Sequence, residues 1–428
     1  MDPPPAAEPA APAAAAPAPN ARREPRPAPG AEFVTLLRGR HTRALSAAHF
    51  ASTAGDWLAF MALFSLSAFE WRSGVHEVSV LAVAYMLPVA LLSPVAGVWV
   101  DRWDLRRVLV ASDLLRAGVT LGMAYCSHFW AMCLLLLVHQ TVSTFFGPAQ
   151  QSALSRLVPP GHLLAANALN SQAGHLTKIL GPGIAGILVS ALGPRGCFYF
   201  DAATFALSGL LLATLPRLPS LGAGPARSFR SEFKDGVRFA FRAPRLNTAL
   251  LLLTLCLAAL GGLIAALPVF ARDQLGAGPR TMGLLLSGLG AGAAAGAFVV
   301  AHVGRLHDKL WAIGSGTFLS GVASMLLART THASLAVAAT TLLGVGVATF
   351  LVPAYALLQE ETPPELLGRV SSLAIAVLSV AQVIGMGIAG AAGVGLAPAA
   401  LVLGIGVVLC AASAIFLVFH SRVTRRRS

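Results

Sequence analysis

Twelve apolar stretches, each long enough to cross a lipid bilayer, limit what this chain can fold into. A membrane-spanning helix needs about 20 apolar residues, and irregular backbone is not tolerated against lipid. The first six stretches cover residues 44–69, 78–100, 108–125, 129–149, 164–191 and 197–215. The other six cover residues 247–271, 281–303, 311–328, 333–357, 370–393 and 397–419. Charged residues make up only 11% of the chain, against roughly 25% in soluble domains. The pattern predicts an all-α membrane protein with twelve transmembrane helices.

Lysine and arginine are distributed unevenly along this pattern. The two termini and every second connection hold 24 of the 31, and the remaining connections hold five, Arg72, Arg195, Arg272, Arg280 and Arg329. Because cytoplasmic segments are enriched in these residues, we expect both termini in the cytoplasm and the protein in the inner membrane of a bacterium. The net charge of +13 then follows from topology and attraction to anionic lipid, so no nucleic-acid partner is expected.

An internal repeat divides the chain into two halves. "FFGPA" at 145–149 matches "FLVPA" at 350–354, and "VPPGHLLAANAL" at 158–169 matches "TPPELLGRVSSL" at 362–373. We therefore expect two six-helix halves in the same orientation, an arrangement known from transporters. The predicted parts are a disordered Pro/Ala-rich tail (1–40), the first half (41–216), a basic amphipathic linker (217–245), the second half (246–420) and a basic tail (421–428).

The charged turn "GVWVDRWDLRR" at 97–107 resembles the signature loop of the major facilitator superfamily. Other stretches resemble the drug and siderophore exporter branch, which includes the enterobactin and macrolide efflux proteins. These are "STAGDWL" (52–58), "ASDLLRA" (111–117), "ILGPGIAG" (179–186) and "TPPELLGRV" (362–370). The resemblance implies a major facilitator fold and export of amphipathic small molecules by alternating access, coupled to proton antiport.

Five residues of the charged turn have the spacing of a conformational latch: Gly97, Asp101, Arg102, Arg106 and Arg107. A glycine lets another helix approach closely, and an aspartate can accept hydrogen bonds from a helix N-terminus. In the family that helix belongs to the other half, while the arginines hold the turn in the cytoplasm. A plain topology anchor is the alternative, but it would not require Gly97 and Asp101.

The resemblance is incomplete at two places. Gly181, Pro182 and Gly186 match the helix-kink motif of antiporters, but Thr177 stands where an earlier glycine is usual. The fourth apolar stretch also lacks the arginine that many drug antiporters carry there. Proton antiport is therefore an expectation from the family.

Five ionisable residues lie inside the apolar stretches: Asp56, Asp113, Arg116, Lys178 and Asp201. A charge inside a membrane costs at least ~2.5 kcal/mol, so each suggests a function or a partner. Asp113 and Arg116 are three residues apart on one helix face and are expected to form a structural ion pair. Asp201, near an outer helix end, is expected to be a cap or a hydrated residue.

A proton site is predicted from Asp56, Lys178 and His139, which should meet near the middle of the membrane. Burial disfavours the charged forms of a carboxylate and an ammonium, whereas pairing favours them, and that balance suits proton loading. His49, on the same helix face as Asp56, is the candidate relay. The alternatives are a fixed Asp56–Lys178 ion pair and two histidines that only pack.

Substrate contacts are expected from aromatic residues of the central helices, Phe60, Phe64, Phe145, Phe270 and Tyr355. No catalytic order, nucleotide-binding motif or metal-ligand spacing is present, so we expect no enzyme, cofactor or metal. The remaining alternatives are a lysophospholipid flippase and a membrane scaffold or sensor that transports nothing.

The five cysteines have no metal-ligand spacing and lie in or beside apolar stretches. We expect small packing residues, with a Cys126–Cys197 disulfide as the alternative. The expected partners are a small-molecule substrate, protons and the lipid bilayer, and the expected oligomeric state is a monomer.

Overall fold

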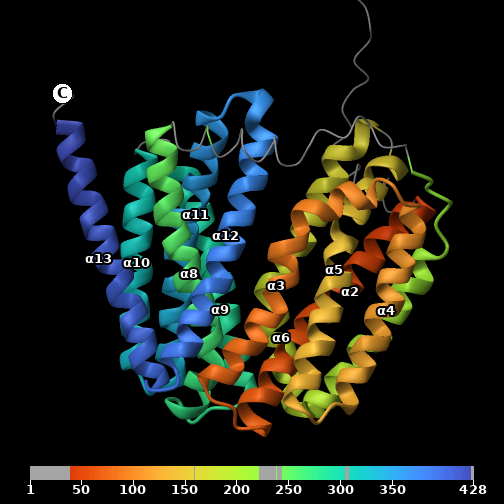
Figure 1. Ribbon diagram of the computed structural model, residues 1–428, viewed down its shortest axis with the longest axis horizontal. Helices are drawn as coiled ribbons and strands as arrows, with labels where there is room; N and C mark the ends of the chain where they lie inside the picture. The colour runs from red at the N-terminus through yellow and green to blue at the C-terminus, as the bar shows by residue number, and fades with distance from the viewer. Residues whose placement is uncertain (1–38, 159, 221–237, 239–242, 304–307, 426–428) are drawn as a thin grey trace, which may run out of the picture.

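The computed structural model describes residues 39–158, 160–220, 238, 243–303 and 308–425 (Figure 1). Within these ranges the chain is helical and contains no β-strand. Nearly all of the tail predicted for 1–40 and most of the linker predicted for 217–245 lie outside the described residues.

The first half consists of α2–α6 and two short helical turns, the π-helix η1 and the 3-10 helix η2. Their bounds are α2 Arg40–Ser65, η1 Leu66–Glu70, α3 Val75–Val100, α4 Leu105–Tyr125, α5 Phe129–Leu157, η2 Pro160–His162 and α6 Leu163–Leu212.

The second half consists of α8–α13. Their bounds are α8 Pro244–Asp273, α9 Pro279–Val303, α10 Lys309–Arg329, α11 Ala333–Glu361, α12 Pro364–Ala392 and α13 Pro398–Arg425. Four of these six helices begin with proline, which has no N–H group to leave unpaired in the first turn. Asp308 caps α10 by accepting a hydrogen bond from the Leu310 N–H at 3.1 Å.

The helix α6 is broken in the middle and covers two of the predicted spans. Gly193 has φ 71° and ψ 165°, a conformation that essentially only glycine adopts, and Pro194 follows it. The break separates residues 163–192 from residues 194–212, which we call the first and second parts of α6.

Ten helices of the described chain are long and apolar enough to cross a membrane, compared with twelve predicted spans. Two features account for the difference. The broken helix α6 enters the count once, as Leu176–Leu212, and α2 does not enter it. Arg40, Arg43 and Asp56 lower the mean hydropathy of α2. The predicted count of twelve is therefore not confirmed, whereas the all-helical membrane architecture is.

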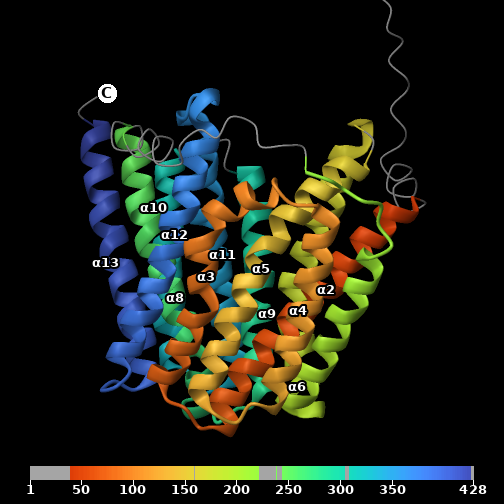
Figure 2. The ribbon, with the colours of Figure 1, turned by 45° about the vertical axis from the view of Figure 1, so that its right-hand side comes forward.

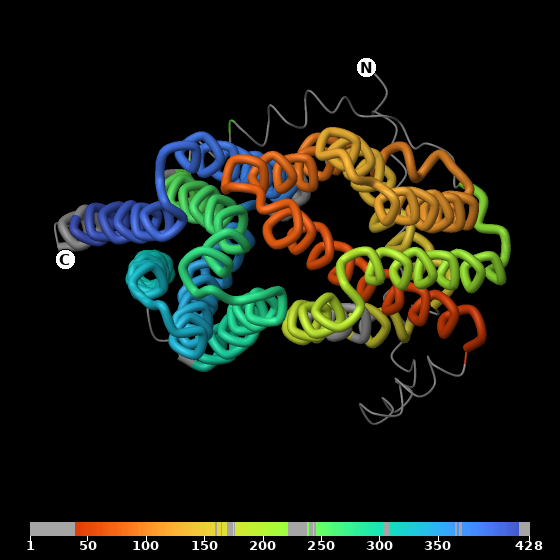
Figure 3. Tube along the Cα trace, turned by 90° about the horizontal axis from the view of Figure 1, so that it is seen from below, coloured from red at the N-terminus to blue at the C-terminus, as the bar shows by residue number. Residues whose placement is uncertain are grey.

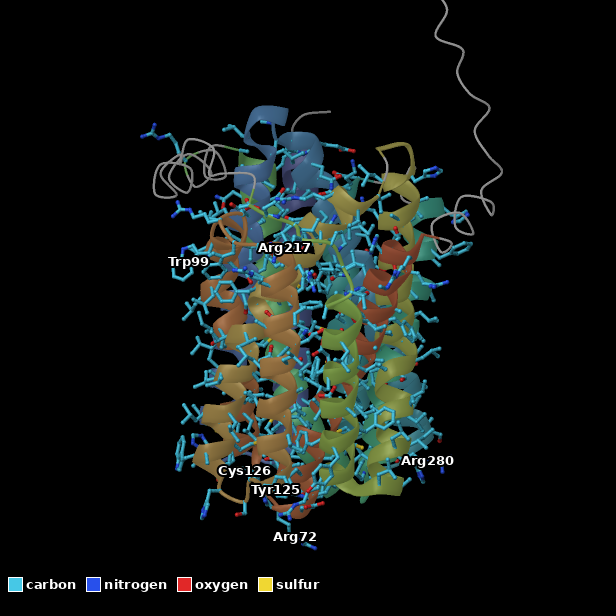
Figure 4. The ribbon with its side chains drawn as sticks, turned by 90° about the vertical axis from the view of Figure 1, so that its right-hand side faces the viewer. Arg72, Trp99, Tyr125, Cys126, Arg217 and Arg280 are labelled. Carbon is cyan, nitrogen blue, oxygen red and sulfur yellow. The ribbon has the colours of Figure 1, made fainter. Side chains whose placement is uncertain are left out.

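The two halves lie close together at one end of the molecule and apart at the other (Figure 1). Figure 4 labels Arg72 and Arg280 at the end where the halves meet and Arg217 at the end where they are apart. We call these two ends of the molecule the Arg72 end and the Arg217 end. Figure 2 shows α13 at one edge of the molecule and α2 and α6 at the opposite edge. Seen along the bundle, α12 lies beside α3 and α9 lies beside the first part of α6 (Figure 3).

Small residues allow the two halves to approach closely at the Arg72 end. A Cβ added to Gly186 of α6 would lie 2.9 Å from the Pro279 carbonyl oxygen and 3.0 Å from the Gly283 Cα of α9. A Cβ added to Gly390 of α12 would lie 2.6 Å from the Ser79 Cβ of α3. Close backbone approach at small residues is the usual basis of helix packing in membranes.

All five cysteines are free, so the Cys126–Cys197 disulfide is not formed. The Cys126 thiol instead lies 3.4 Å from the His128 carbonyl oxygen, to which it donates. Cys197 is buried in the core of the second part of α6.

Candidate functional site

Arg116 is the centre of a buried polar cluster in the first half. Only 1% of its side chain is exposed, although it lies within the membrane-spanning part of α4. The guanidinium carbon lies 4.5 Å from the ring centroid of Phe146 and 4.4 Å from that of Phe205. Stacking between two aromatic faces stabilises a desolvated guanidinium, and α5 and the second part of α6 provide these faces.

Asp113 neutralises the charge of Arg116. The two side chains form an ion pair with a hydrogen bond, as their spacing predicts, and the Asp113 side chain is fully buried. The second carboxylate oxygen of Asp113 accepts a hydrogen bond from Ser208 of α6. Arg116 also donates to the Ser52 hydroxyl of α2 at 3.1 Å. We call Ser52, Asp56, Asp113, Arg116 and Ser208 the Arg116 cluster.

Asp56 is the less tightly bound carboxylate of this cluster. Its Oδ1 lies 3.7 Å from Arg116 Nη1, a distance at which charges attract without a hydrogen bond. The Asp56 side chain is 33% exposed, whereas that of Asp113 is not exposed at all. One guanidinium therefore faces two carboxylates, one held rigidly and one held loosely.

The structure corrects the predicted partner of Asp56. Lys178 is exposed on the first part of α6 and forms no ion pair within the described chain, while Asp56 pairs with Arg116. The Lys178 carbonyl oxygen faces α9, and a Cβ added to Gly290 would lie 2.8 Å from it. The rotation of α6 that packs its backbone against α9 thus leaves the Lys178 side chain outside the cluster.

His139 does lie next to Asp56, as predicted. Both line a cavity of about 10 Å³, together with Tyr85 and Gln140. That volume is about the space that one water molecule occupies. The His139 side chain is only 3% exposed, and neither ring nitrogen has a hydrogen-bond partner in the described structure. An imidazole with two unpaired nitrogens beside a carboxylate is a candidate for proton exchange.

His49 of α2 and Asp201 of the second part of α6 are two further polar residues near Asp56. His49 Nδ1 is 3.5 Å from the Thr53 hydroxyl, so Thr53 lies between His49 and Asp56 on one helix face. Asp201 is fully buried rather than hydrated near the surface, which corrects the prediction. Its Oδ1 accepts a hydrogen bond from Thr204 at 3.2 Å, and a Cβ added to Gly55 would overlap this carboxylate.

The predicted latch does not contact the second half in this conformation. Asp101 is exposed, and its carboxylate has no hydrogen bond or ion pair among the residues that the structure describes. A Cβ added to Gly97 would meet no atom within 4 Å. Arg106 donates instead to the Ala213 carbonyl oxygen of its own half. The halves are apart at this end, so the partner that a latch needs is out of reach.

The glycines of the predicted kink motif are packing positions. The only non-helical backbone inside α6 is at Gly193, so no break occurs at Gly181, Pro182 or Gly186. A Cβ added to Gly181 would lie 2.8 Å from the Trp57 ring, and Gly186 faces α9. The motif therefore lets α6 approach α2 and the second half.

The five aromatic candidates for substrate contact divide into three groups. Phe64 and Phe270 are core residues, 1% and 0% exposed, in contrast to the prediction. Phe145 lies in a groove between α4 and α5. Phe60 is partly buried, and Tyr355 is exposed on α11. Helices that are apolar on every side give no sequence signal for which side is buried.

Arg272 of α8 was not predicted as a functional residue, yet it joins the two halves at the Arg72 end. It donates to the Ala68 carbonyl oxygen at 2.6 Å and to the Ser73 carbonyl oxygen at 2.9 Å. Asp273 accepts two hydrogen bonds from the same guanidinium and orients it. The sequence signal that could have indicated this role is the adjacent pair Arg272 and Asp273, directly after the apolar stretch 247–271.

No three His, Cys, Asp or Glu side chains of the described chain lie close enough together to hold a metal ion.

Solved structures with a similar fold match most of the chain. They include the nucleoside transporter NupG, with a TM-score of 0.69 at 14% identity, covering 88% of this chain and 98% of that one. A bacterial homologue of the human lysosomal transporter Spinster, in an inward-facing and unoccupied conformation, has a TM-score of 0.67 at 16% identity. The match covers 88% of this chain and 92% of the Spinster homologue.

Sequence relatives extend over most of the chain. The uncharacterized MFS-type transporter YfiS of Bacillus subtilis (strain 168) is 29% identical over 354 residues, which cover 80% of this chain and 84% of YfiS. Macrolide efflux protein A of Enterococcus faecalis is 23% identical over 309 residues, which cover 70% of this chain and 96% of that protein. The model of the Major Facilitator Superfamily matches residues 45–386 and 262–428. The chain belongs to the Major Facilitator Superfamily of membrane transporters.

Proposed function

We propose that this protein exports amphipathic small molecules in exchange for protons. The observation that carries the proposal is the loosely held Asp56 beside the Asp113–Arg116 pair. Asp113 and Arg116 together are electroneutral, so an ionised Asp56 leaves one net negative charge on the Arg116 cluster. Proton uptake by Asp56 removes that charge and weakens its attraction to Arg116 without unpairing the guanidinium.

The route for the proton in this proposal leads through polar groups of α2 and α5, of which His139 is buried and His49 is partly buried. His139 lines the same small cavity as Asp56, and one water molecule there would bridge the two side chains. His49 and Thr53 extend the polar path toward the Arg217 end. An imidazole with free nitrogens can accept and return a proton.

The proposed cycle rocks the two halves against each other, as parallel-repeat transporters do. In our proposal the chain crosses the membrane twelve times, with both termini in the cytoplasm of a bacterium. The break of α6 at Gly193 supports this count, as does the contact of α2 with α6. The Arg217 end then faces the cytoplasm, and the present conformation is open inward. Asp101 would reach the second half only after that end has closed.

The proposed substrates are amphipathic, because the partly exposed residues of the central helices are apolar and aromatic. The ring centroid of Phe60 lies 4.5 Å from that of Phe64 and 5.5 Å from that of Tyr85. Tyr355 is exposed on α11 of the other half. Such surfaces bind many related molecules rather than one. A macrolide is the first compound to test, given the relative named for macrolide efflux.

The test uses the full chain in liposomes that are acidic inside. We expect radiolabelled macrolide to accumulate inside, and to leave when an ionophore collapses the pH gradient. Equal macrolide accumulation with and without the pH gradient would contradict proton coupling. Flux of labelled lysophospholipid without macrolide flux would favour the flippase alternative, and no flux of either would favour a scaffold.

A further inference from the structure

A groove lies between α4 and α5 at the Arg217 end, and no step of the proposed transport cycle uses its apolar walls. Its volume is about 560 Å³, and its walls are almost entirely apolar. The residues that define it are Leu115, Val142 and Phe145 along its length and Arg102, Trp103 and Arg107 at its mouth.

The groove opens toward the hydrocarbon of the membrane. Leu115 is 56% exposed on α4, and Leu134 and Val138 are 63% and 44% exposed farther along the same side of α5. Large apolar side chains left exposed on membrane-spanning helices face lipid tails. The groove is therefore a lipid-facing furrow whose charged groups, Arg102, Asp104 and Arg107, all lie at one end.

The mouth of the groove carries a net positive charge. Arg102 and Arg107 are both exposed, and neither guanidinium has an ion pair in the described part of the chain. Asp104 is the one acidic side chain of the lining, and its carboxylate accepts a hydrogen bond from the Arg107 backbone N–H at 3.0 Å. Two guanidinium groups thus face the mouth against one carboxylate that already caps α4.

Aromatic rings surround the mouth of the groove, at the level expected for the membrane–water interface. The Trp103 ring lies 6.0 Å from Trp99 and 5.9 Å from Phe145. Trp99 and Trp103 are 51% and 44% exposed, and Figure 4 shows Trp99 near the Arg217 end. Tryptophan is enriched where lipid headgroups meet the hydrocarbon.

The geometry points to a binding site for one anionic phospholipid. The guanidinium groups of Arg102 and Arg107 would bind its phosphate, which planar forks suit well. An acyl chain would lie along Leu115 and Val142, where an inorganic anion could not make contact. Charge complementarity at the mouth and apolar contact below it select a lipid with a negative headgroup over a zwitterionic one.

Quenching of tryptophan fluorescence by brominated lipids tests this site directly. One variant retains Trp103 and has the other five tryptophans replaced by phenylalanine; a matched control retains Trp130. Trp130 is 74% exposed and lies on α5 at the Arg72 end, away from both arginines. We expect brominated phosphatidylglycerol to compete about fivefold better than brominated phosphatidylcholine at Trp103. At Trp130 the two lipids should compete equally.

Substitution and salt then separate a lipid site from other causes. Arg102→Gln with Arg107→Gln should remove the preference at Trp103 and leave Trp130 unchanged. If that protein does not fold, a second test uses the protein that retains both arginines. Raising the ionic strength should reduce its preference for brominated phosphatidylglycerol over brominated phosphatidylcholine at Trp103. Inorganic phosphate at equal concentration should not displace the quencher. Equal quenching by both lipids at Trp103, a preference that survives both treatments, or displacement by phosphate would overturn the site.

Discussion

Arg116 is almost fully buried between Phe146 and Phe205, so its charge is compensated by Asp113 rather than by water. Removing one partner of a buried ion pair leaves an uncompensated charge, which costs more than the pair itself contributes. Asp113 and Asp56 therefore have different roles, although both face the same guanidinium. The first holds α4 to α2 and α6 through Ser208, and the second is the proton carrier in our proposal.

Replacing Arg116 tests this structural role. We expect Arg116→Gln to lower the free energy of unfolding by about 3–5 kcal/mol, because it leaves Asp113 buried without its partner. The control is Lys178→Gln, an exposed cation without an ion pair, which should change stability by less than about 0.5 kcal/mol. Chemical unfolding in mixed detergent micelles would measure both. Similar losses in the two variants would contradict the assignment.

The sequence could predict part of this cluster at the residue scale. Asp113 and Arg116 are three residues apart on one helix, so local geometry alone brings them together. The pairing of Asp56 with Arg116 depends on how α2, α4 and α6 are rotated, and no local rule determines that rotation. The expected Asp56–Lys178 pair was wrong for the same reason.

Among the helices, α6 depends most on a single residue. Gly193 has positive φ, and a Cβ added there would meet no atom within 4 Å. The cost of another residue at this position would therefore be conformational rather than steric.

Gly193→Ala should lower the free energy of unfolding by about 1–3 kcal/mol. Gly118→Ala in α4 is the matched control, because its Cβ would also meet nothing, while its backbone is helical. There alanine should be neutral or stabilise by up to about 1 kcal/mol. Thermal unfolding of both variants would compare them. A Gly193→Ala protein as stable as the Gly118→Ala protein would contradict this account of the break.

The positions of the helices could be predicted from hydropathy far better than their faces. A helix that is apolar all round has no amphipathic stripe to show its buried side. Phe64 and Phe270 were therefore expected at the substrate path but lie in the core. The charged Asp56 could be recognised because any charge inside a membrane is costly.

For the molecule as a whole, contacts between the halves at the Arg72 end hold the present conformation. Arg272 of the second half donates hydrogen bonds to two backbone carbonyl oxygens of the first half, at Ala68 and Ser73. His76 adds a longer contact, 3.4 Å from the Gly390 carbonyl oxygen. Opening this end must break these contacts.

Arg272→Gln should shift the protein toward conformations that are open at the Arg72 end. The loss of about 1.5 kcal/mol of charge-assisted hydrogen bonding corresponds to about a tenfold change in the ratio of states. Spin labels at Ser127 and Thr331, in a background without the five native cysteines, would report the separation at this end. Arg280→Gln, an exposed arginine at the same end, is the control. Identical distance distributions in both variants would contradict the role of Arg272.

The central claim is that Asp56 carries the coupled proton, and solute flux through the Asp56→Asn protein tests it most directly. Asparagine resembles the protonated carboxyl and leaves the Asp113–Arg116 pair intact. We expect solute counterflow in liposomes to persist, because the halves can still rock, and accumulation driven by a pH gradient to vanish. Lys178→Ala, which leaves the Arg116 cluster intact, should retain both activities. Accumulation driven by the pH gradient in the Asp56→Asn protein would contradict the claim.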